Sequence, residues 1–551
     1  MNVKIKEKLI LLYGERADEA EKELEKVLNK FAQRDFPQKE KINEKNAYLI
    51  AYGDSILREG QTPLATLNEV LSETIAGAIT DVHLLPMFPF TSDDGFSVTD
   101  YYKINPQYGT WEDIEHLSKN YRLMFDFVAN HMSKDSEWFQ SFLQEEEDFK
   151  EAFVIFDEEF DASNTVRPRT SPLFHNYKEK KVWTTFSEDQ VDVNIKDPKM
   201  FARLTEVLLT YASKGAASIR LDAIGFLWKE SGSRSIHLWQ THEVIKIWRK
   251  LLEELSPNTQ IITETNVPHE ENISYFGKND EANQVYQFPL PPLVLHSFTV
   301  GDAQKLSAWA KGIEGRGDTE TYFNFLASHD GIGMRPTEGI LSDVERNNLV
   351  EKVIENGGEI SYKENTDGSR SVYELNINYS EALRNKGETD EIAVEKMKAA
   401  HSILFSVIGV PAIYYHSLFG SRNDYKGVLD SGINRRINRE KLSAERLLDE
   451  LKSDPYRNGI YMGLKKMLEK RAQYKAFSPY GKQEILDIDK RVFAVKRTHL
   501  NQEIISITNV SNQKVTLYDL EGMDIIKEKT IPKQMELEPY AYIWCYNNTN
   551  K

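Results

Sequence analysis

Short apolar segments recur along the first 480 residues, and segments with helical spacing of apolar residues, such as 62–74, separate them. Eight of these segments have the length and composition of buried strands: residues 47–53, 81–88, 122–131, 216–222, 260–264, 283–288, 323–330 and 410–415. Strands that alternate with helices at this spacing form right-handed β/α units and a parallel sheet. The pattern therefore predicts an α/β fold, a (β/α)8 TIM barrel over residues 47–480.

Three regions depart from this alternation. Residues 1–46 begin with apolar residues at helical spacing, which predicts a helical N-terminal extension followed by a polar connector. Residues 132–199, after the third strand, are irregular and long enough to form an inserted subdomain over the active site. Beyond residue 480 the apolar period changes to two, so 481–551 is expected to be a C-terminal antiparallel β domain.

Composition narrows the possible partners. The 551 residues carry a formal net charge of -17, which would repel nucleic acid and anionic membranes. No segment approaches the length and apolarity of a membrane span. The one cysteine, Cys545, has no internal disulfide partner, which favours a reduced, cytoplasmic location. We expect a monomer or a homodimer that acts on small molecules.

Three of the predicted strands deliver an acidic residue at the carboxyl end: Asp222, Glu264 and Asp330. In a barrel these ends form the pocket. Arg220 lies two residues before Asp222, on the same face, where it would hold that carboxylate ionised and oriented. Alone, the pair could equally be a structural ion pair. Together, the three acids match a glycosidase site with a nucleophile, an acid/base and a third acid that orients the sugar.

Four ordered segments resemble the signature regions of the α-amylase superfamily: residues 126–131, 219–223, 262–264 and 328–330. Together with residues 92–101, 190–194, 288–296 and 329–333, they resemble the sucrose phosphorylase subfamily. The resemblance extends from about residue 47 to the C-terminus. It implies a retaining phosphorolysis, in which an α-glucoside and inorganic phosphate give α-glucose 1-phosphate and a released acceptor, without a cofactor or metal ion.

The same resemblance implies roles for individual residues. Asp222 would attack the anomeric carbon, Glu264 would give its proton to the leaving oxygen, and Asp330 would bind two sugar hydroxyls as the ring flattens. The further substrate contacts that it implies are Asp94, His131, Gln190, Arg220, His329 and Arg439. Of these, Asp94 and Arg439 match a pair that closes the back of the glucose pocket. Without the motifs, each histidine could be an ordinary imidazole at a strand end.

A proline-stiffened segment, residues 166–172, carries Arg167 and Arg169. Two guanidinium groups on such a segment suit bidentate binding of phosphate or carboxylate. By resemblance this segment covers the acceptor site, with Tyr373 and Gln190 as companions. A surface Arg-Pro turn is the alternative.

The chain departs from sucrose phosphorylases on the acceptor side. Their acceptor loop reads Leu-Asp-Leu-Tyr, whereas residues 370–373 here read Arg-Ser-Val-Tyr. After Glu264 the chain has Asn266 in the segment Thr-Asn-Val-Pro-His, where sucrose phosphorylases usually show a Val-His pair. Both changes resemble the glucosylglycerate phosphorylase branch, and the cationic Arg370 favours an anionic acceptor such as D-glycerate. We expect 2-O-α-D-glucosylglycerate to be cleaved better than sucrose.

Other functions share parts of this pattern. Sucrose, sucrose 6'-phosphate and glucosylglycerol phosphorylases differ from the expected enzyme in the acceptor alone. A hydrolase or transglucosidase would use the same carboxylates without a need for phosphate. A binding or chaperone subunit of the same fold typically lacks one of the three acids, and this chain has all three.

Overall fold

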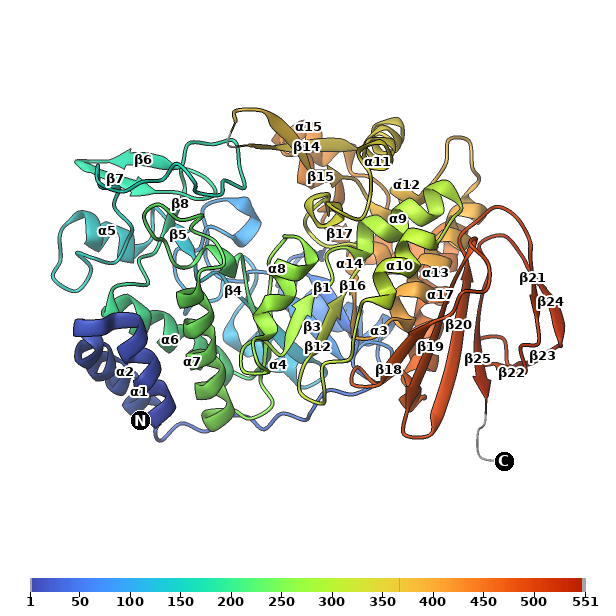
Figure 1. Cartoon of the computed structure of the whole chain (residues 1–551), viewed down its shortest axis with the longest axis horizontal. Helices are drawn as coiled ribbons and strands as arrows, with labels where there is room; N and C mark the ends of the chain where they lie inside the picture. The colour runs from blue at the N-terminus through green and yellow to red at the C-terminus, as the bar shows by residue number, and fades with distance from the viewer. Residues whose placement is uncertain (1, 366, 548–551) are drawn as a thin grey trace.

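The computed structural model describes residues 2–365 and 367–547, and in this part of the chain eight parallel strands close into a barrel (Figure 1). In order around the barrel the strands are β1 (Tyr48–Ala51), β3 (Asp81–Leu84), β4 (Arg122–Phe127), β9 (Ala216–Leu221), β10 (Gln260–Thr263), β11 (Gln284–Tyr286), β12 (Thr321–Asn324) and β16 (Val410–Tyr414). Seven of the predicted strand segments contain one of these strands, and β12 begins two residues before the remaining segment, 323–330, and overlaps it. The predicted barrel is confirmed.

Helices surround the barrel. Those that follow barrel strands or close the ring include α3 (Pro63–Thr74), α4 (Trp111–Ser118), α6 (Pro198–Ser213), α7 (Trp239–Leu255), α9 (Leu290–Val300), α10 (Gln304–Lys311), α13 (Asp390–Ser406) and α17 (Pro455–Arg471). Proline at the first position of α3, α6 and α17 fixes a backbone angle that suits a helix start, where no N–H donor is needed. No helix of the described residues is long and apolar enough to span a bilayer.

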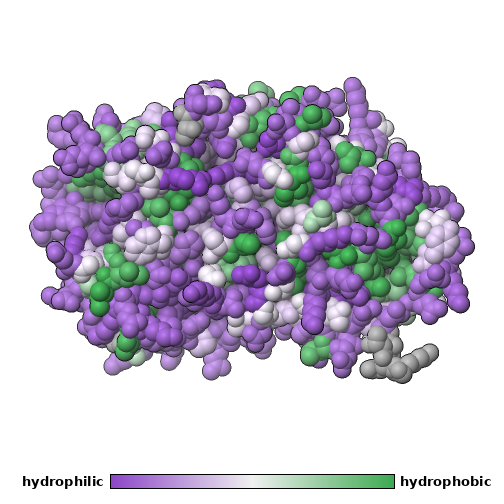
Figure 2. Space-filling view, in the orientation of Figure 1, coloured by the Kyte–Doolittle hydropathy of each residue, from purple (hydrophilic) through white to green (hydrophobic). Residues whose placement is uncertain are grey.

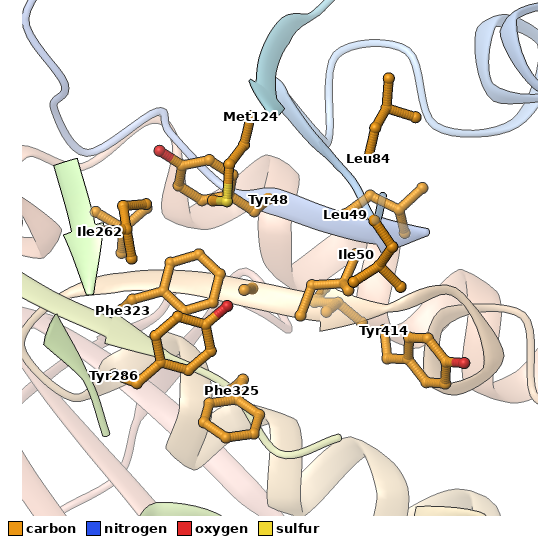
Figure 3. Close-up of a cluster of buried hydrophobic side chains, with 14 of the residues drawn as sticks. Tyr48, Leu49, Ile50, Leu84, Met124, Ile262, Tyr286, Phe323, Phe325 and Tyr414 are labelled. Atoms are coloured by element: carbon orange, nitrogen blue, oxygen red, sulfur yellow. The ribbon is translucent and has the colours of Figure 1, made fainter. Parts of the chain in front are cut away.

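Apolar side chains from different strands fill the barrel interior (Figure 3). Alternate strand residues point inward, and the rings of Tyr48 and Phe323 lie 5.2 Å apart, with Tyr286 4.5 Å from Phe323. Met124 and Ile262 extend this cluster in Figure 3. The packed interior forms a rigid base for the polar residues at the carboxyl ends of the strands.

The N-terminal extension consists of two helices, α1 (Val3–Tyr13) and α2 (Ala17–Phe31). Gly14, with φ of 52°, ends the first helix. The buried face of α2 packs against α6, and α1 packs against α7 (Figure 1). The extension thus covers the outside of the barrel and adds no residue to its strand ends.

Two excursions from the barrel lie along the upper edge of the molecule in Figure 1. The first follows β4 and contains β5 (His131–Ser133), α5 (Glu137–Leu143), β6 (Phe174–Tyr177), β7 (Lys180–Trp183) and β8 (Gln190–Asp192). The second follows β12 and contains the hairpin of β14 (Glu359–Glu364) and β15 (Arg370–Asn376). β5 and β8 are antiparallel and pair His131 with Asp192 and Ser133 with Gln190.

The C-terminal region is antiparallel, as predicted from its period of two. One sheet is formed, in spatial order, by β18 (Lys482–Ile485), β19 (Val492–His499), β20 (Gln502–Asn509), β25 (Tyr542–Asn547), β22 (Gly522–Asp524) and β23 (Lys529–Ile531). β21 (Val515–Tyr518) and β24 (Gln534–Leu537) form a second sheet. Val492, Ile507 and Leu537 belong to an apolar core of this region alone. Figure 2 shows a mainly hydrophilic face, with hydrophobic residues gathered over this region at the right.

Two buried arginines lie where the barrel meets this β region, and Arg497 belongs to the β region itself. Arg471 of α17 donates to the carbonyl oxygens of Phe405 at 3.0 Å and Phe477 at 3.1 Å. Arg497 of β19 donates to the carbonyl oxygens of Ser406 at 3.0 Å and Ser478 at 2.7 Å. Burial lowers the pKa of each guanidinium to about 9. Phe405 and Ser406 end α13, so both cations lie at the negative end of a helix dipole.

Candidate active site

The register of two neighbouring strands places Asp222 beside Glu264. Leu221 of β9 pairs with Thr263 of β10, so the next residue of each strand emerges at the same level. The Asp222 amide donates to the Phe127 carbonyl at 3.1 Å, and the Glu264 amide donates to the Leu221 carbonyl at 3.1 Å. The backbone of both acids is therefore held by the barrel ladder.

Asp330, which follows β12, lines the same cavity as Asp222 and Glu264. The cavity has a volume of about 280 Å³ and opens at the carboxyl ends of the barrel strands. The three carboxyl groups that the sequence singled out thus share one cavity. Mostly buried carboxyl groups around a concave site are typical of glycoside chemistry.

Arg220 lies beneath this cavity and connects the acids. One of its nitrogens, Nη1, donates at 2.8 Å to Asp222 and at 2.8 Å to Asp126. Nη2 lies 3.8 Å from Glu264 Oε2, and Nε donates to the Tyr286 hydroxyl at 3.0 Å. The predicted pairing of Arg220 with Asp222 is present, and it fixes which oxygen of Asp222 remains free to face the cavity.

Burial raises the pKa of both Asp222 and Glu264, and Arg220 opposes the rise in each case. The Ala223 amide also donates to Glu264 Oε2 at 2.9 Å, from a residue with φ of 46°. Because the two carboxyl groups lie side by side, a proton on one favours ionisation of the other. Arg220 bonds directly to Asp222 and not to Glu264, so the geometry favours an anionic Asp222 when Glu264 holds the proton.

The pKa of Asp330 is shifted in the opposite direction to the pKa values of Asp222 and Glu264. Burial acts to raise its pKa, but Arg435 at 2.8 Å, with His329 and Arg439, outweighs burial and holds the pKa below its ordinary value. Arg435 also bonds Glu374 through two nitrogens at 2.6 and 3.0 Å. Asp330 is therefore a fixed anion. Arg435 was not predicted from the sequence, although it lies in the same segment as Arg439.

His131 and Gln190 form one wall of the cavity. His131 Nε2 lies 3.0 Å from the Phe96 carbonyl oxygen, and Gln190 Nε2 donates to Asp93 at 3.2 Å. The His131 ring is buried, which lowers its pKa. Both side chains line the cavity, on the paired strands β5 and β8.

His329 forms the opposite wall and stacks on Phe96, with ring centroids 4.9 Å apart and an interplanar angle of 8°. Burial lowers its pKa well below the ordinary range, so the imidazole is neutral. Behind it, Arg439 donates to the His329 carbonyl at 2.8 Å and pairs with Asp94 at 2.7 Å. Asp94 and Arg439 form the predicted ion pair, but they stand behind the lining residues.

The outer part of the cavity, called the mouth below, is formed by residues of the two excursions. Arg167 Nη1 lies 3.3 Å from Glu364 of β14, and Nη2 donates to the Ser171 carbonyl at 2.7 Å. The Arg169 guanidinium lies over the rings of Phe186, at 5.6 Å, and Tyr373, at 5.4 Å. Segment 166–172 thus faces the hairpin β14–β15 across the mouth.

Asn266 also lines the cavity, and its buried Oδ1 has no hydrogen-bond partner among the described residues. Arg370 is different. It is exposed at the start of β15 and does not line the cavity. The structure therefore brings together every predicted phosphate- or acceptor-binding residue except Arg370.

Several charged or polar lining residues were not predicted: Asp93, His237, Arg335, Lys363, Glu364, Glu374 and Arg435. Glu374 stands next to the predicted Tyr373, and Asp93 next to Asp94, so adjacency in the sequence was an available signal. No local pattern marks Arg335 or Lys363, because long excursions of the chain bring them to the cavity.

Lys229 supports the wall that carries His131 and Gln190. Its buried ammonium donates to Asn130 at 2.7 Å and pairs with Asp192 at 2.7 Å. Burial lowers the pKa of Lys229, and Asp192 opposes this shift. Among the residues that the structure describes, no group of three or more His, Cys, Asp or Glu side chains is arranged to hold a metal ion.

Known proteins share this architecture and sequence. The model of the alpha-amylase catalytic domain matches residues 77–331. A glucosylglycerate phosphorylase of Spirochaeta thermophila is 46% identical over 86% of this chain and 81% of its own length. That of Allomeiothermus silvanus is 43% identical over 98% of both chains. The crystal structure of a sucrose 6F-phosphate phosphorylase from Thermoanaerobacter thermosaccharolyticum superposes with a TM-score of 0.75 at 24% identity, over 89% of this chain and 97% of that one.

Proposed function

Because this chain belongs to the glucosylglycerate phosphorylase family of the α-amylase superfamily, we propose that it is a retaining phosphorylase. It converts 2-O-α-D-glucosylglycerate and inorganic phosphate into α-D-glucose 1-phosphate and D-glycerate. The observation that carries the proposal is the convergence of three carboxyl groups in one cavity, with Arg220 bonded to the first and a cationic mouth above them.

In the first step an Asp222 oxygen attacks the anomeric carbon and forms a β-glucosyl ester. The bond from that carbon to the glycerate oxygen breaks, and its electron pair leaves with the oxygen, which takes the proton of Glu264. The raised pKa of Glu264 supports its role as the acid. D-Glycerate departs.

In the second step an oxygen of hydrogen phosphate attacks the same carbon. The ester bond breaks, its electron pair returns to Asp222, and a proton passes from the incoming phosphate to Glu264. Two inversions give net retention of the α configuration. The fixed anion Asp330 accepts hydrogen bonds from sugar hydroxyls, more strongly as the ring flattens, and so favours the transition state over the ground state.

The mouth of the cavity supports phosphate, in preference to water, as the second nucleophile. Arg169 lies against aromatic rings and has no carboxylate partner among the described residues. Its guanidinium fork can bind a phosphate in a bidentate manner. We propose Arg169 as the principal phosphate ligand, with Arg167 and Tyr373 beside it.

We also propose that the enzyme acts in the cytoplasm on small molecules, as a monomer or a homodimer and without a nucleic-acid or membrane partner. The net charge of -17 supports this view, because it repels polyanions.

A substrate panel tests the function. The purified protein is incubated with glucosylglycerate, glucosylglycerol, sucrose or sucrose 6'-phosphate, with and without phosphate, and glucose 1-phosphate and free glucose are measured. We expect phosphate-dependent glucose 1-phosphate to form fastest from glucosylglycerate. Glucose release at the same rate with and without phosphate would indicate a hydrolase, and a preference for sucrose would reject the proposed acceptor.

A further inference from the structure

Two cations at the mouth of the cavity are unpaired or only weakly paired with carboxylates. Lys363 of β14 lines the cavity, is partly buried, and makes no side-chain hydrogen bond or ion pair with the described residues. Arg335, which lies in the short segment Arg335–Thr337 after β12, also lines the cavity, and its nearest carboxylate is Glu271 at 3.9 Å. The Arg335 side chain is only 14% exposed.

The neighbouring acids of the mouth are already paired. Glu364 lies 3.3 Å from Arg167, and Glu374 is held at 2.6 Å by Arg435. Glu338 acts on Lys363 from a distance, without an ion pair, and Glu271, 3.9 Å from Arg335, lies closer to Arg234, at 3.3 Å. The positive charge of Lys363 and Arg335 is therefore only partly balanced. Burial lowers the pKa of Lys363, and Arg335 lowers it further. A bound anion would relieve the cost of placing two cations together in a partly desolvated site.

We propose that Lys363 and Arg335 form the subsite for the carboxylate of the acceptor, distinct from the phosphate ligand Arg169. This inference rests on the proposed function and deepens it. In glucosylglycerate the carboxylate is attached to the carbon that bears the glycosidic oxygen. It therefore stands beside the bond that breaks and points toward the mouth, where these two cations lie.

Ring contacts connect Arg169 to the wall that carries His131. The Phe186 ring lies 5.0 Å from the His131 ring and 5.6 Å from the Arg169 guanidinium. Phosphate must reach the anomeric carbon, and a cation connected to this wall suits that role. Lys363 and Arg335 lie on the second excursion, after β12, and serve the group that leaves.

The test compares one donor with the carboxylate and one without it. Lys363→Met and Arg335→Met variants are assayed with glucosylglycerate and with α-D-glucosyl fluoride, which carries no acceptor. We expect each substitution to lower kcat/KM for glucosylglycerate by about 30-fold or more, because a desolvated carboxylate loses a charged partner. The loss with glucosyl fluoride should be much smaller, and the KM for phosphate with that donor should stay within about twofold.

Two further variants and one further measurement make the test specific. Lys363→Arg keeps the charge and should retain most of the glucosylglycerate activity. Lys386→Met removes an exposed lysine that does not line the cavity and serves as the matched control for lost charge. Thermal unfolding of each variant separates a folding defect from a binding defect.

The outcomes distinguish this inference from the proposed function. Equal losses with both donors, or a KM for phosphate that rises in parallel, would overturn the separate carboxylate subsite. Wild-type preference for glucosylglycerate, with unchanged kcat/KM in both methionine variants, would reject the subsite and leave the function intact. A wild-type protein that does not cleave glucosylglycerate would reject the function itself.

Discussion

The floor and the mouth of the cavity are built in different ways. At the floor, acids emerge from the ends of barrel strands, and each has a fixed neighbour: Arg220 bonds Asp222, and Arg435 bonds Asp330. At the mouth, the lining residues come from two excursions, and Arg169 and Lys363 have no carboxylate partner among the described residues.

This difference separates the chemistry from the choice of acceptor. Strand register holds the reacting carboxyl groups, and a shift of one residue would turn them away from the cavity. Residues on excursions can change without loss of that register. One barrel can therefore keep glucosyl transfer constant while the mouth selects the group that leaves.

The largest effect is expected at the floor. Asp222→Asn replaces the anionic carboxylate nucleophile with a neutral amide, so kcat should fall by roughly four orders of magnitude or more. Single-turnover assays and mass spectrometry of the trapped glucosyl enzyme measure this loss. An Asp222→Asn protein that still turns over glucosylglycerate at the wild-type rate would contradict the assignment of the nucleophile.

The second largest effect is expected from loss of the proton that Glu264 gives to the leaving oxygen. Glu264→Gln should lower kcat for glucosylglycerate by about 10²- to 10⁴-fold, with a much smaller loss for α-D-glucosyl fluoride, because fluoride leaves without a proton. Glu264 must be protonated for the first step, and its pKa is raised. Activity should therefore extend above the ordinary range of a glutamic acid and decline as pH rises through the raised pKa.

A pH profile of kcat/KM, measured with each of the two donors, tests whether activity declines as pH rises. The alkaline decline that arises from Glu264 should be present with glucosylglycerate and absent, or strongly reduced, with glucosyl fluoride. The same decline with both donors would assign that limb of the profile to another group.

The third largest effect is expected for Lys229, which supports the wall of the cavity that carries His131 and Gln190. Lys229→Met leaves Asp192 buried without its cation, and breaking a buried ion pair in this way costs about 3–5 kcal/mol. Denaturant unfolding measures the loss. The double variant Lys229→Met/Asp192→Asn should recover part of it, and a double variant as unstable as the two single losses added would argue against the pairing.

The smallest effect is expected at the rim. Arg370 is exposed and does not line the cavity, so Arg370→Ala should change kcat/KM for glucosylglycerate by less than about threefold and stability by less than about 0.5 kcal/mol. A large, substrate-specific loss would restore the role that the sequence suggested for Arg370 and would show that the hairpin moves when substrate binds.

The sequence predicted the floor better than the mouth for a physical reason. Barrel strands are short apolar runs, and residues that follow them, such as Asp222 and Glu264, must emerge at one end of a parallel sheet. Their convergence follows from topology. Arg370 was predicted at the acceptor because residues 370–373 stand where sucrose phosphorylases have Leu-Asp-Leu-Tyr, yet Arg370 and Tyr373 face different surroundings at the start and middle of β15.

Lys363 lines the mouth, but no sequence pattern predicted that position. It has no motif, and the turn of the hairpin β14–β15 and the length of the excursion decide where it lies. Lys229 is similar, because a lysine after Asp222 in the sequence gives no sign that Asp192, on a distant strand, will be its partner. Local periodicity does not predict which charged residues pair when they are far apart in the sequence.

Arg497 links the β region to the barrel, and this contact bears on how the chain could be shortened. Arg497 belongs to β19, yet it donates to the Ser406 carbonyl oxygen at the end of α13, the helix that leads into barrel strand β16. A chain cut before Lys482 would lose that guanidinium. The terminal sheet thus caps the helix that precedes the last barrel strand, and we expect a fragment without the sheet to be less stable than the full chain.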